Sequence, residues 1–413
     1  MLANRYHDPL LTGPPLRQRR VCVLISAALL VVLMFAALIQ LSVLASMPSD
    51  AASVYLKALT LSGLLAVVPL TLLWFLDRRE RASGWLFAAA FFWGGCIATA
   101  LALPFNTAFF QLIDAWVTQH PAITLVLGPD AAMMLAAPIS APIIEEIAKA
   151  LGVLLIFWLL RAEFDTMRDG FVYGAAVGLG FNWSEAALYV AQGYAESGVA
   201  LYGSELGGRY ALLGLGGHAM FTGMFGACLG FALHTNRVWL RTLAPIVGIT
   251  LAIAAHMLNN SLPLLAALAG AAAGEPPGGR EPLADVGFLE SFLSGSLIQV
   301  VVFLPFLVIV GFGLWRSGLW ERRVIREELA GEVGHAVSPG EYQEIVRDRI
   351  FRTRRINGMR RRASSALVNA QHELAFRKRR VRDHGKNPER DHLIQHWREE
   401  IRRLRQVPTW QSG

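Results

Sequence analysis

Long apolar runs separated by short polar segments dominate this chain. A helix needs about 20 consecutive apolar residues to cross the hydrocarbon core of a bilayer, and about eight runs reach that length. The pattern therefore predicts an all-α, polytopic membrane protein with about eight transmembrane helices. The predicted helices cover approximately residues 21–45, 53–76, 84–104, 131–160, 171–193, 210–234, 242–268 and 290–315.

The composition agrees with a membrane protein. Of the 413 residues, 54% are hydrophobic and only 17% are charged, and the mean hydropathy is +0.42. The formal net charge of +7 is unevenly distributed. From Arg316 onward there are about 23 Lys and Arg against about 13 Asp and Glu, so the basic excess belongs to the C-terminal tail. The three cysteines form no CxxC pair, which argues against a disulfide framework or a thiolate metal site.

The distribution of basic residues predicts the orientation in the membrane. Arginines cluster in the N-terminal segment, in alternate loops and in the tail, whereas the opposite loops carry very few. The positive-inside rule then places both termini in the cytoplasm, as an even number of spans also requires. The loops predicted to lie outside are 46–52, 105–130, 194–209 and 269–289.

The tail is predicted to be a separate helical unit. Ser338, Pro339 and Glu341 have the spacing of a capped helix start, and further helices are predicted near 366–381 and 388–404. We expect this basic unit to contact anionic lipid headgroups. Nucleic acid is not an expected partner, because no aromatic residues for base stacking are interleaved with the arginines.

Ionisable residues lie inside several of the apolar runs, where a charge is expensive and calls for a partner or a function. Measured from the predicted cytoplasmic helix ends, Glu146, Glu185, His218 and His256 lie about 14–16 residues deep, or about 21–24 Å, although successive helices run in opposite directions. The sequence therefore predicts that the ionisable residues meet at one level in the membrane. The whole set is Glu145, Glu146, Lys149, Glu185, His218 and His256, the last with Asn260 on the same helix face.

Small residues around these positions favour close helix packing. Glycines at three- and four-residue spacing precede Glu185 and follow His218. Pro138 and Pro142 predict a bend just before the glutamate pair. Each polar group alone has a structural explanation, such as an ion pair of Lys149 with a glutamate. A structural explanation is weaker for the whole set, because the single charge of one lysine does not compensate the two charges of adjacent glutamates.

The residues also form four motifs in a characteristic order. Residues 145–149 read EEIAK, residues 181–185 read FNWSE, His218 is followed by AMFTG, and residues 256–260 read HMLNN. This set resembles the PrsW family of intramembrane proteases, relatives of the CAAX prenyl endopeptidases and the bacteriocin-processing enzymes. The resemblance covers roughly residues 131–265, and the lysine and glutamate at 149 and 185 favour the PrsW branch.

The resemblance implies hydrolysis of peptide bonds in membrane-associated protein substrates, in regulated proteolysis of the kind that acts on an anti-sigma factor. It implies a bacterial cytoplasmic (inner) membrane location. The resulting domain division is a cytoplasmic N-terminus, three transmembrane helices with an outer loop, a catalytic transmembrane core, an outer loop with the last span, and the basic tail. The respective limits are 1–20, 21–130, 131–268, 269–315 and 316–413.

Two mechanisms fit the candidate catalytic residues. In one, zinc is held by His218, His256 and a glutamate, with Glu185 as the expected ligand, while another glutamate is the base. In the other there is no cofactor: Glu145 or Glu146 activates water, helped by Glu185 or His218, and His256 with Asn260 stabilises the oxyanion. Lys149 and Phe181 are expected to support the site electrostatically and structurally.

Two other classes of protein also bury such residues. A proton-coupled transporter does so, although the chain shows no repeated halves. A non-catalytic membrane protein that binds peptides would tolerate Glu146→Gln. The oligomeric state is not predicted.

Overall fold

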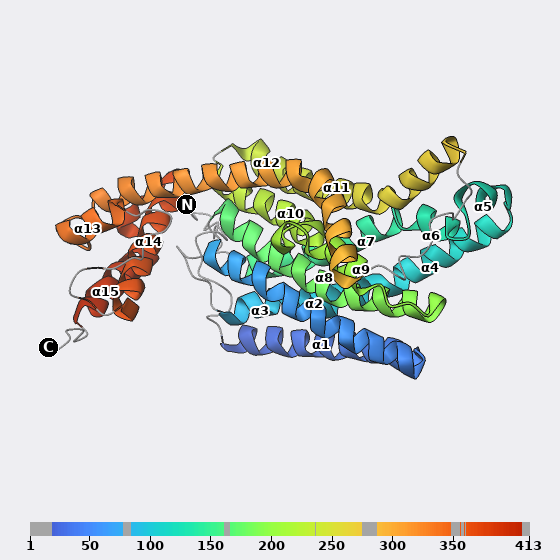
Figure 1. Ribbon diagram of the computed structural model, residues 1–413. Helices are drawn as coiled ribbons and strands as arrows, with labels where there is room; N and C mark the ends of the chain where they lie inside the picture. Colours follow the sequence, from blue (N-terminus) through green and yellow to red (C-terminus); the bar gives the residue numbers. More distant parts are fainter. Residues whose placement is uncertain are drawn as a thin grey trace, which may run out of the picture. The chain divides into compact units, whose positions relative to one another are not determined.

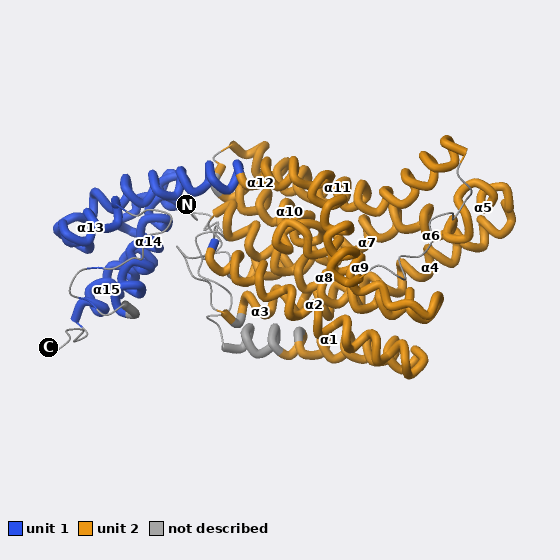
Figure 2. Tube along the Cα trace, viewed as in Figure 1, with its two compact units in different colours: residues 1–13, 76–82, 312–413 blue, residues 14–75, 83–311 orange. Residues whose placement is uncertain are grey.

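The computed structural model describes residues 19–76, 84–160, 166–235, 237–274, 287–347 and 361–406, together with residues 356 and 359. The secondary structure of these residues is helical (Figure 1), which confirms the predicted all-α class. The chain divides into two compact units (Figure 2). Unit 2 consists of Pro14–Phe75 and Ser83–Gly311, and unit 1 contains Phe312–Gly413.

Unit 2 is a bundle of helices that covers the predicted transmembrane region. Its helices are α1 Arg19–Ser46, α2 Ser49–Leu76, α3 Gly84–Phe92, η2 Trp93–Ala98, α4 Thr99–Thr118, α5 Ala122–Leu127, α6 Ala131–Ala136, α7 Ser140–Leu160, α8 Met167–Ser197, α9 Tyr202–Tyr210, η3 Leu212–Gly214, α10 Gly217–His234, α11 Val238–Ala272 and the first part of α12 Phe288–Ala330.

Helices occupy all eight predicted ranges, and four helices of the described residues are long and apolar enough to cross a membrane. Two more are apolar but shorter, at Leu30–Ser46 and Gly217–Leu233. The chain is thus an integral membrane protein, while the count of eight spans stays a prediction. The four long helices are Ser49–Leu76, Leu86–Thr118, Val238–Ala272 and Phe288–Ala330.

Two segments predicted as outer loops are largely helical instead. In the predicted loop 105–130, the helical segment that begins at Gly84 continues past Pro104 to Thr118 as α4. The predicted loop 194–209 contains most of α9. Apolar residues continue through the first segment, so the helix has no reason to end at the proline. The bend predicted at Pro138 is confirmed, because a turn at residues 137–139 separates α6 from α7.

Helix α8 is the centre of unit 2, and almost every residue of its first two thirds is buried. It begins with a capping box in which Thr166 and Asp169 exchange hydrogen bonds, and it ends at Gly198, whose φ of 74° is left-handed. Its glycines allow α10 to pack directly against its backbone. A Cβ at Gly170 would lie 1.9 Å from the Gly226 oxygen, and one at Gly178 would lie 2.1 Å from the His218 oxygen.

This packing is reciprocal and antiparallel. A Cβ on Gly226 would lie 2.0 Å from the Gly170 oxygen, and one on Gly230 would lie 2.3 Å from the Thr166 oxygen. On another face of α8, a Cβ on Gly180 would lie 1.7 Å from the Phe91 oxygen. The close packing predicted from the glycine spacing is confirmed, and it fixes where His218 starts relative to α8.

Unit 1 is a small helical domain with its own apolar core. It contains the last part of α12 with α13 Pro339–Val346, α14 Arg361–Asp383, η5 Pro388–Arg390 and α15 His392–Gln406. The predicted helix start at Ser338 is confirmed, with a capping box to Glu341. Residues Leu329, Leu367 and Ile394 are among those fully buried in the core.

Candidate active site

Three buried ionisable residues of α7 lie together, and Glu146 has the most partners. One of its carboxylate oxygens accepts from Lys149 Nζ at 2.7 Å and from His256 Nδ1 at 3.1 Å. The other oxygen accepts from Thr222 Oγ1 at 2.9 Å. The side chain is 1% exposed. Three donors therefore hold this carboxylate, as a buried charge requires.

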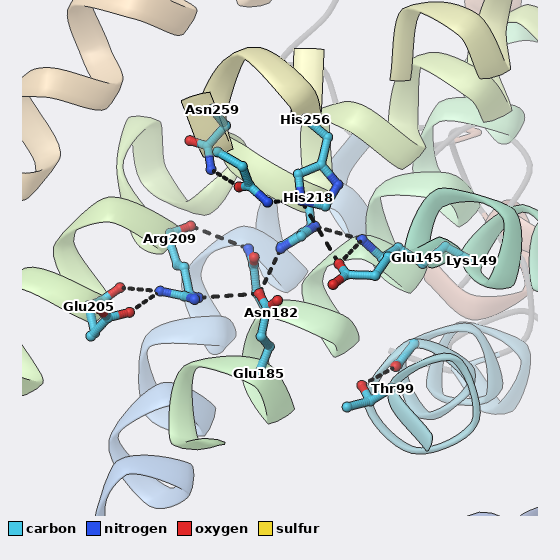
Figure 3. Close-up of polar contacts among 12 residues, drawn as sticks. Thr99, Glu145, Lys149, Asn182, Glu185, Glu205, Arg209, His218, His256 and Asn259 are labelled. Atoms are coloured by element: carbon cyan, nitrogen blue, oxygen red, sulfur yellow. Dashed lines mark hydrogen bonds and ion pairs between the residues drawn. The ribbon is translucent and has the colours of Figure 1, made fainter. Parts of the chain in front are cut away.

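His218 is the second residue of α10 and follows a strained turn. Leu212 and Leu213 are non-glycine residues with left-handed φ angles of 55° and 59°, and Gly217 has a φ of 54°. Such strain clusters at functional sites. The imidazole Nε2 lies 2.8 Å from Glu185 Oε2, and Nδ1 lies 2.6 Å from Lys149 Nζ (Figure 3).

His256 is buried on α11 and points toward the same centre. Its Nδ1 faces Glu146, while its Nε2 lies 3.3 Å from Asn260 Nδ2 and 3.9 Å from Glu145 Oε2. Asn260 Nδ2 is also 3.2 Å from the Ala137 oxygen. That carbonyl lies in the turn before α7, so the break at Pro138 leaves it available to the asparagine. Asn260 thus ties the turn to His256.

Glu145 is the glutamate of the pair that faces a cavity. Its Oε1 accepts a 3.0 Å hydrogen bond from Asn106 Nδ2, and Ser140 Oγ donates to Asn106 at 2.8 Å. Its Oε2 lies 3.4 Å from Lys149 Nζ. The ammonium of Lys149 lies 3.8 Å from the centre of the Phe181 ring, a cation–π contact. The supporting roles of Lys149 and Phe181 stay predictions.

The cavity beside Glu145 has a volume of about 260 Å³. Most of its lining is apolar and comes from α4, α6, α7 and α8. Glu145, Glu185 and Glu196 are its acidic residues, while Glu146, His218 and His256 do not line it. A peptide segment in this cavity would meet three carboxylates. The small residues in its wall are Thr99, Ala102, Thr107, Ala136, Ala137, Ser140 and Ala141.

Each of the two histidines has one nitrogen that carries no proton and could bind a metal. An ionised carboxylate only accepts, so the nitrogens that face Glu185 and Glu146 carry the protons. The unprotonated nitrogens, His218 Nδ1 and His256 Nε2, lie 2.6 Å from Lys149 Nζ and 3.3 Å from Asn260 Nδ2, so a metal would take the place of these two donors. Glutamate, histidine and histidine is a ligand set that zinc uses in peptidases, and ligating histidines characteristically donate their other N–H to a carboxylate.

The metal candidates are Glu145, His218 and His256, which bring one ligand atom each within 4.8 Å of one another. The donor set therefore fits a metal. It differs from the predicted set, because Glu185 lies against the opposite nitrogen of His218. All six ionisable residues predicted from the sequence, with Asn260, are brought together.

Four polar residues of the site were not predicted. Asn106 holds Glu145, Thr222 holds Glu146, Arg209 forms an ion pair with Glu185, and Gln299 donates to Asn259 beside Asn260. Thr222 lies four residues after His218 on the same helix face, which is a usable signal. Asn106 and Arg209 belong to segments predicted as loops, so no spacing argument pointed to them.

Comparison with known proteins identifies the family. No curated protein and no solved structure matches the chain. The model of the PrsW family of intramembrane metalloproteases matches residues 82–310, more than half of the chain and all the helices that carry the site. This match does not favour the transporter or the non-catalytic alternative. The chain belongs to the PrsW family of intramembrane metalloproteases, so it is a membrane-embedded protease.

Proposed function

We propose that the chain cleaves membrane-associated protein substrates at the site formed by Glu145, His218 and His256. The observation that carries this proposal is their convergence beside a largely apolar cavity, with Glu145 in its wall. Amide hydrolysis needs an activated water, a group that stabilises the oxyanion, and a proton for the leaving amine. The buried glutamates and histidines are suited to these tasks.

The two adjacent glutamates differ in their surroundings, which supports different roles. Glu146 accepts from three side chains and does not line the cavity, so we assign it to orienting His256. Glu145 has an oxygen near His256 and lies in the cavity wall. We assign the contact with the reacting water to Glu145. Glu185, a further carboxylate in the wall, orients His218 and lies close enough to share the proton on its Nε2.

His218, His256 and Glu145 are the residues that would hold a metal, and we propose zinc. When bound, zinc would lower the pKa of a water molecule and polarise the scissile carbonyl. Lys149 compensates the charge of Glu146 and lies close to Glu145 and His218. Asn260 Nδ2 lies 3.3 Å from the His256 nitrogen that would bind the metal, and it also donates to the Ala137 oxygen. We propose that Asn260 supports the position of His256, in addition to its predicted role toward the oxyanion.

The cavity suggests which part of a substrate is recognised. Its volume of about 260 Å³ accommodates a short stretch of side chains rather than a folded helix. Apolar residues such as Phe110 and Met133 line it together with the small residues of α4 and α6. We propose that it receives an extended, apolar segment of a membrane protein, with the scissile bond beside Glu145.

We further propose that the chain resides in a bacterial cytoplasmic membrane with both termini in the cytoplasm, as the arginine distribution predicts. The tail would then lie near anionic headgroups, where clustered basic residues are attracted. Arg322, Arg323 and Arg326 lie on one side of α12 and line a shallow hollow in unit 1, which supports this placement.

The test compares membrane peptidomes of cells that express the wild type or Glu145→Gln. Glu290→Gln, which changes an exposed carboxylate at the start of α12, is the matched control. We expect fragments with new termini near transmembrane segments in the wild type and the control, and their loss in Glu145→Gln. Identical peptidomes for the three proteins at equal levels would contradict the proposal. The fragments would also identify the substrate.

A further inference from the structure

Arg209 is a partly buried charge outside the four sequence motifs. It lies near the end of α9, the short helix between α8 and α10, and its side chain is 19% exposed. Its guanidinium forms ion pairs with Glu205 on the same helix and with Glu185 on α8, where the Nε–Oε2 distance is 3.5 Å. The guanidinium carbon also lies 4.9 Å from the centre of the Tyr189 ring.

These contacts connect Arg209 to the histidine of the site. The Glu185 oxygen that faces Arg209 is the same oxygen that lies 2.8 Å from His218 Nε2. Three groups of alternating charge, Glu205, Arg209 and Glu185, therefore lead from α9 through α8 to the imidazole of His218 on α10 (Figure 3). Such an arrangement restricts the carboxylate in the middle more than either partner alone would.

Helix α9, which carries Arg209, packs closely against neighbouring helices. A Cβ at Gly203 would lie 2.6 Å from the Phe288 oxygen, and one at Gly207 would lie 2.2 Å from the Phe292 oxygen, so α9 packs directly on the start of α12. Tyr210 Oη lies 2.8 Å from Ser62 Oγ on α2. The Arg209 oxygen accepts from Asn182 Nδ2 at 3.3 Å. The helix is thus anchored on three sides.

We propose that Arg209 is a positioning residue for metal binding. It holds the Glu185 carboxylate against His218 Nε2, and this fixes the ring so that Nδ1 faces the centre shared with Glu145 and His256. The inference rests on the proposed function, because it assumes that these three residues hold a metal. Groups that orient a ligating histidine typically change metal affinity by about 10–100-fold when they are removed.

A purely structural role of Arg209 makes a different prediction. If the guanidinium served only to dock α9, any loss of α9 anchoring would weaken the site equally. Tyr210→Phe removes the hydrogen bond to Ser62 and leaves Arg209 in place. Arg209→Lys keeps a positive charge but loses the planar fork that contacts two carboxylates. The two variants therefore separate docking from positioning.

The experiment uses the full-length protein purified in detergent and freed of metal. Zinc affinity is measured by competition with a chromophoric chelator for the wild type, Arg209→Met, Arg209→Lys and Tyr210→Phe. The thermal unfolding midpoint of each metal-free protein shows whether it is folded. We expect affinity to fall by about 10–100-fold in Arg209→Met, by less in Arg209→Lys, and to stay near the wild-type value in Tyr210→Phe.

Two results would overturn the inference without affecting the proposed function: wild-type affinity in a folded Arg209→Met, or an equal loss in Tyr210→Phe. A wild type that binds no zinc would overturn the proposed metal site and this inference together. Cleavage in the peptidome experiment is read separately, so the two failures are distinguishable.

Discussion

The packing of α8 on α10 makes the site sensitive to a single methyl group at Gly178. A Cβ there would lie 2.1 Å from the backbone oxygen of His218, whereas carbon–oxygen contacts between packed backbones are about 3.3–3.6 Å. The substitution Gly178→Ala therefore requires a separation of about 1 Å between α8 and α10 at this point. The displaced residue is His218 itself.

Two consequences of Gly178→Ala differ in size. Overpacking of a well-packed interior destabilises by about 1–3 kcal/mol. Displacement of a catalytic group by about 1 Å can lower the rate by about 100-fold. We therefore expect a folded protein with a modestly lower unfolding midpoint, while zinc affinity and fragment yield fall far more strongly.

Two glycines of the same helix are matched controls. Gly193 is in α8, and no atom of the described residues would lie within 4 Å of a Cβ there, so Gly193→Ala should be neutral or slightly stabilising through helix propensity. A Cβ at Gly170 would lie 1.9 Å from the Gly226 oxygen, about 12 Å along α8 from Gly178. Gly170→Ala should destabilise as much as Gly178→Ala but lower zinc affinity less.

The assays are thermal unfolding in detergent, zinc competition, and the yield of substrate fragments in membranes. Wild-type zinc affinity and fragment yield in Gly178→Ala would refute the reasoning, since they would mean that the bundle absorbs the methyl group without moving His218. Equal losses of affinity in Gly178→Ala and Gly170→Ala would show general loosening of the bundle instead.

Three further predictions concern other parts of the molecule. Glu146→Gln should destabilise the protein by about 3–5 kcal/mol, because it leaves Lys149 without its nearest charge partner, whereas Glu145→Gln should abolish cleavage with a smaller shift of the unfolding midpoint. Ala102→Trp should fill the cavity and block cleavage in the peptidome without lowering zinc affinity. Burial raises the pKa of Glu332, but hydrogen bonds from Arg398 and Lys378 outweigh burial, so the pKa is lowered overall. The ionised Glu332 therefore stabilises folded unit 1 above the unfolded-state pKa of this carboxyl group. That stabilisation is lost as the pH falls through the lowered folded-state pKa. Amide hydrogen exchange in α14 and α15, corrected for intrinsic rates, should therefore accelerate in acid.

Much of the site is predictable from the sequence because charge is rare in apolar helices. Glu145, His218 and His256 stand out against their apolar neighbours, and their equal predicted depth in the membrane is enough to place them together. The bend at Pro138 is predictable for a similar reason, since proline removes a backbone donor. Its consequence is not, because nothing local links the freed Ala137 oxygen to Asn260 far along the chain.

The parts that could not be predicted depend on segments without a clear period. The sequence predicts a loop over residues 105–130, yet α4 extends into them and brings Asn106 to Glu145. The tail shows another limit of inferring interactions from charge. Its basic residues suggest attraction to lipid, but many are paired inside unit 1, as Lys378 and Arg398 are with Glu332.

The sequence also does not rank the two adjacent glutamates, because neighbours on a helix point about 100° apart and nothing in the motif indicates which direction faces the substrate. The contacts supply that ranking. Glu146 has its three donors on α7, α10 and α11, so it binds those helices together at the depth of the histidines. Glu145 has Asn106 on α4 and the cavity on its other side. Glu146 cannot turn toward the cavity without losing these hydrogen bonds, whereas a carboxylate at a cavity wall can meet water and peptide. We therefore propose that Glu146 is the structural member of the pair and Glu145 the reactive one, with the glycine-packed α8 and α10 holding His218 close to both.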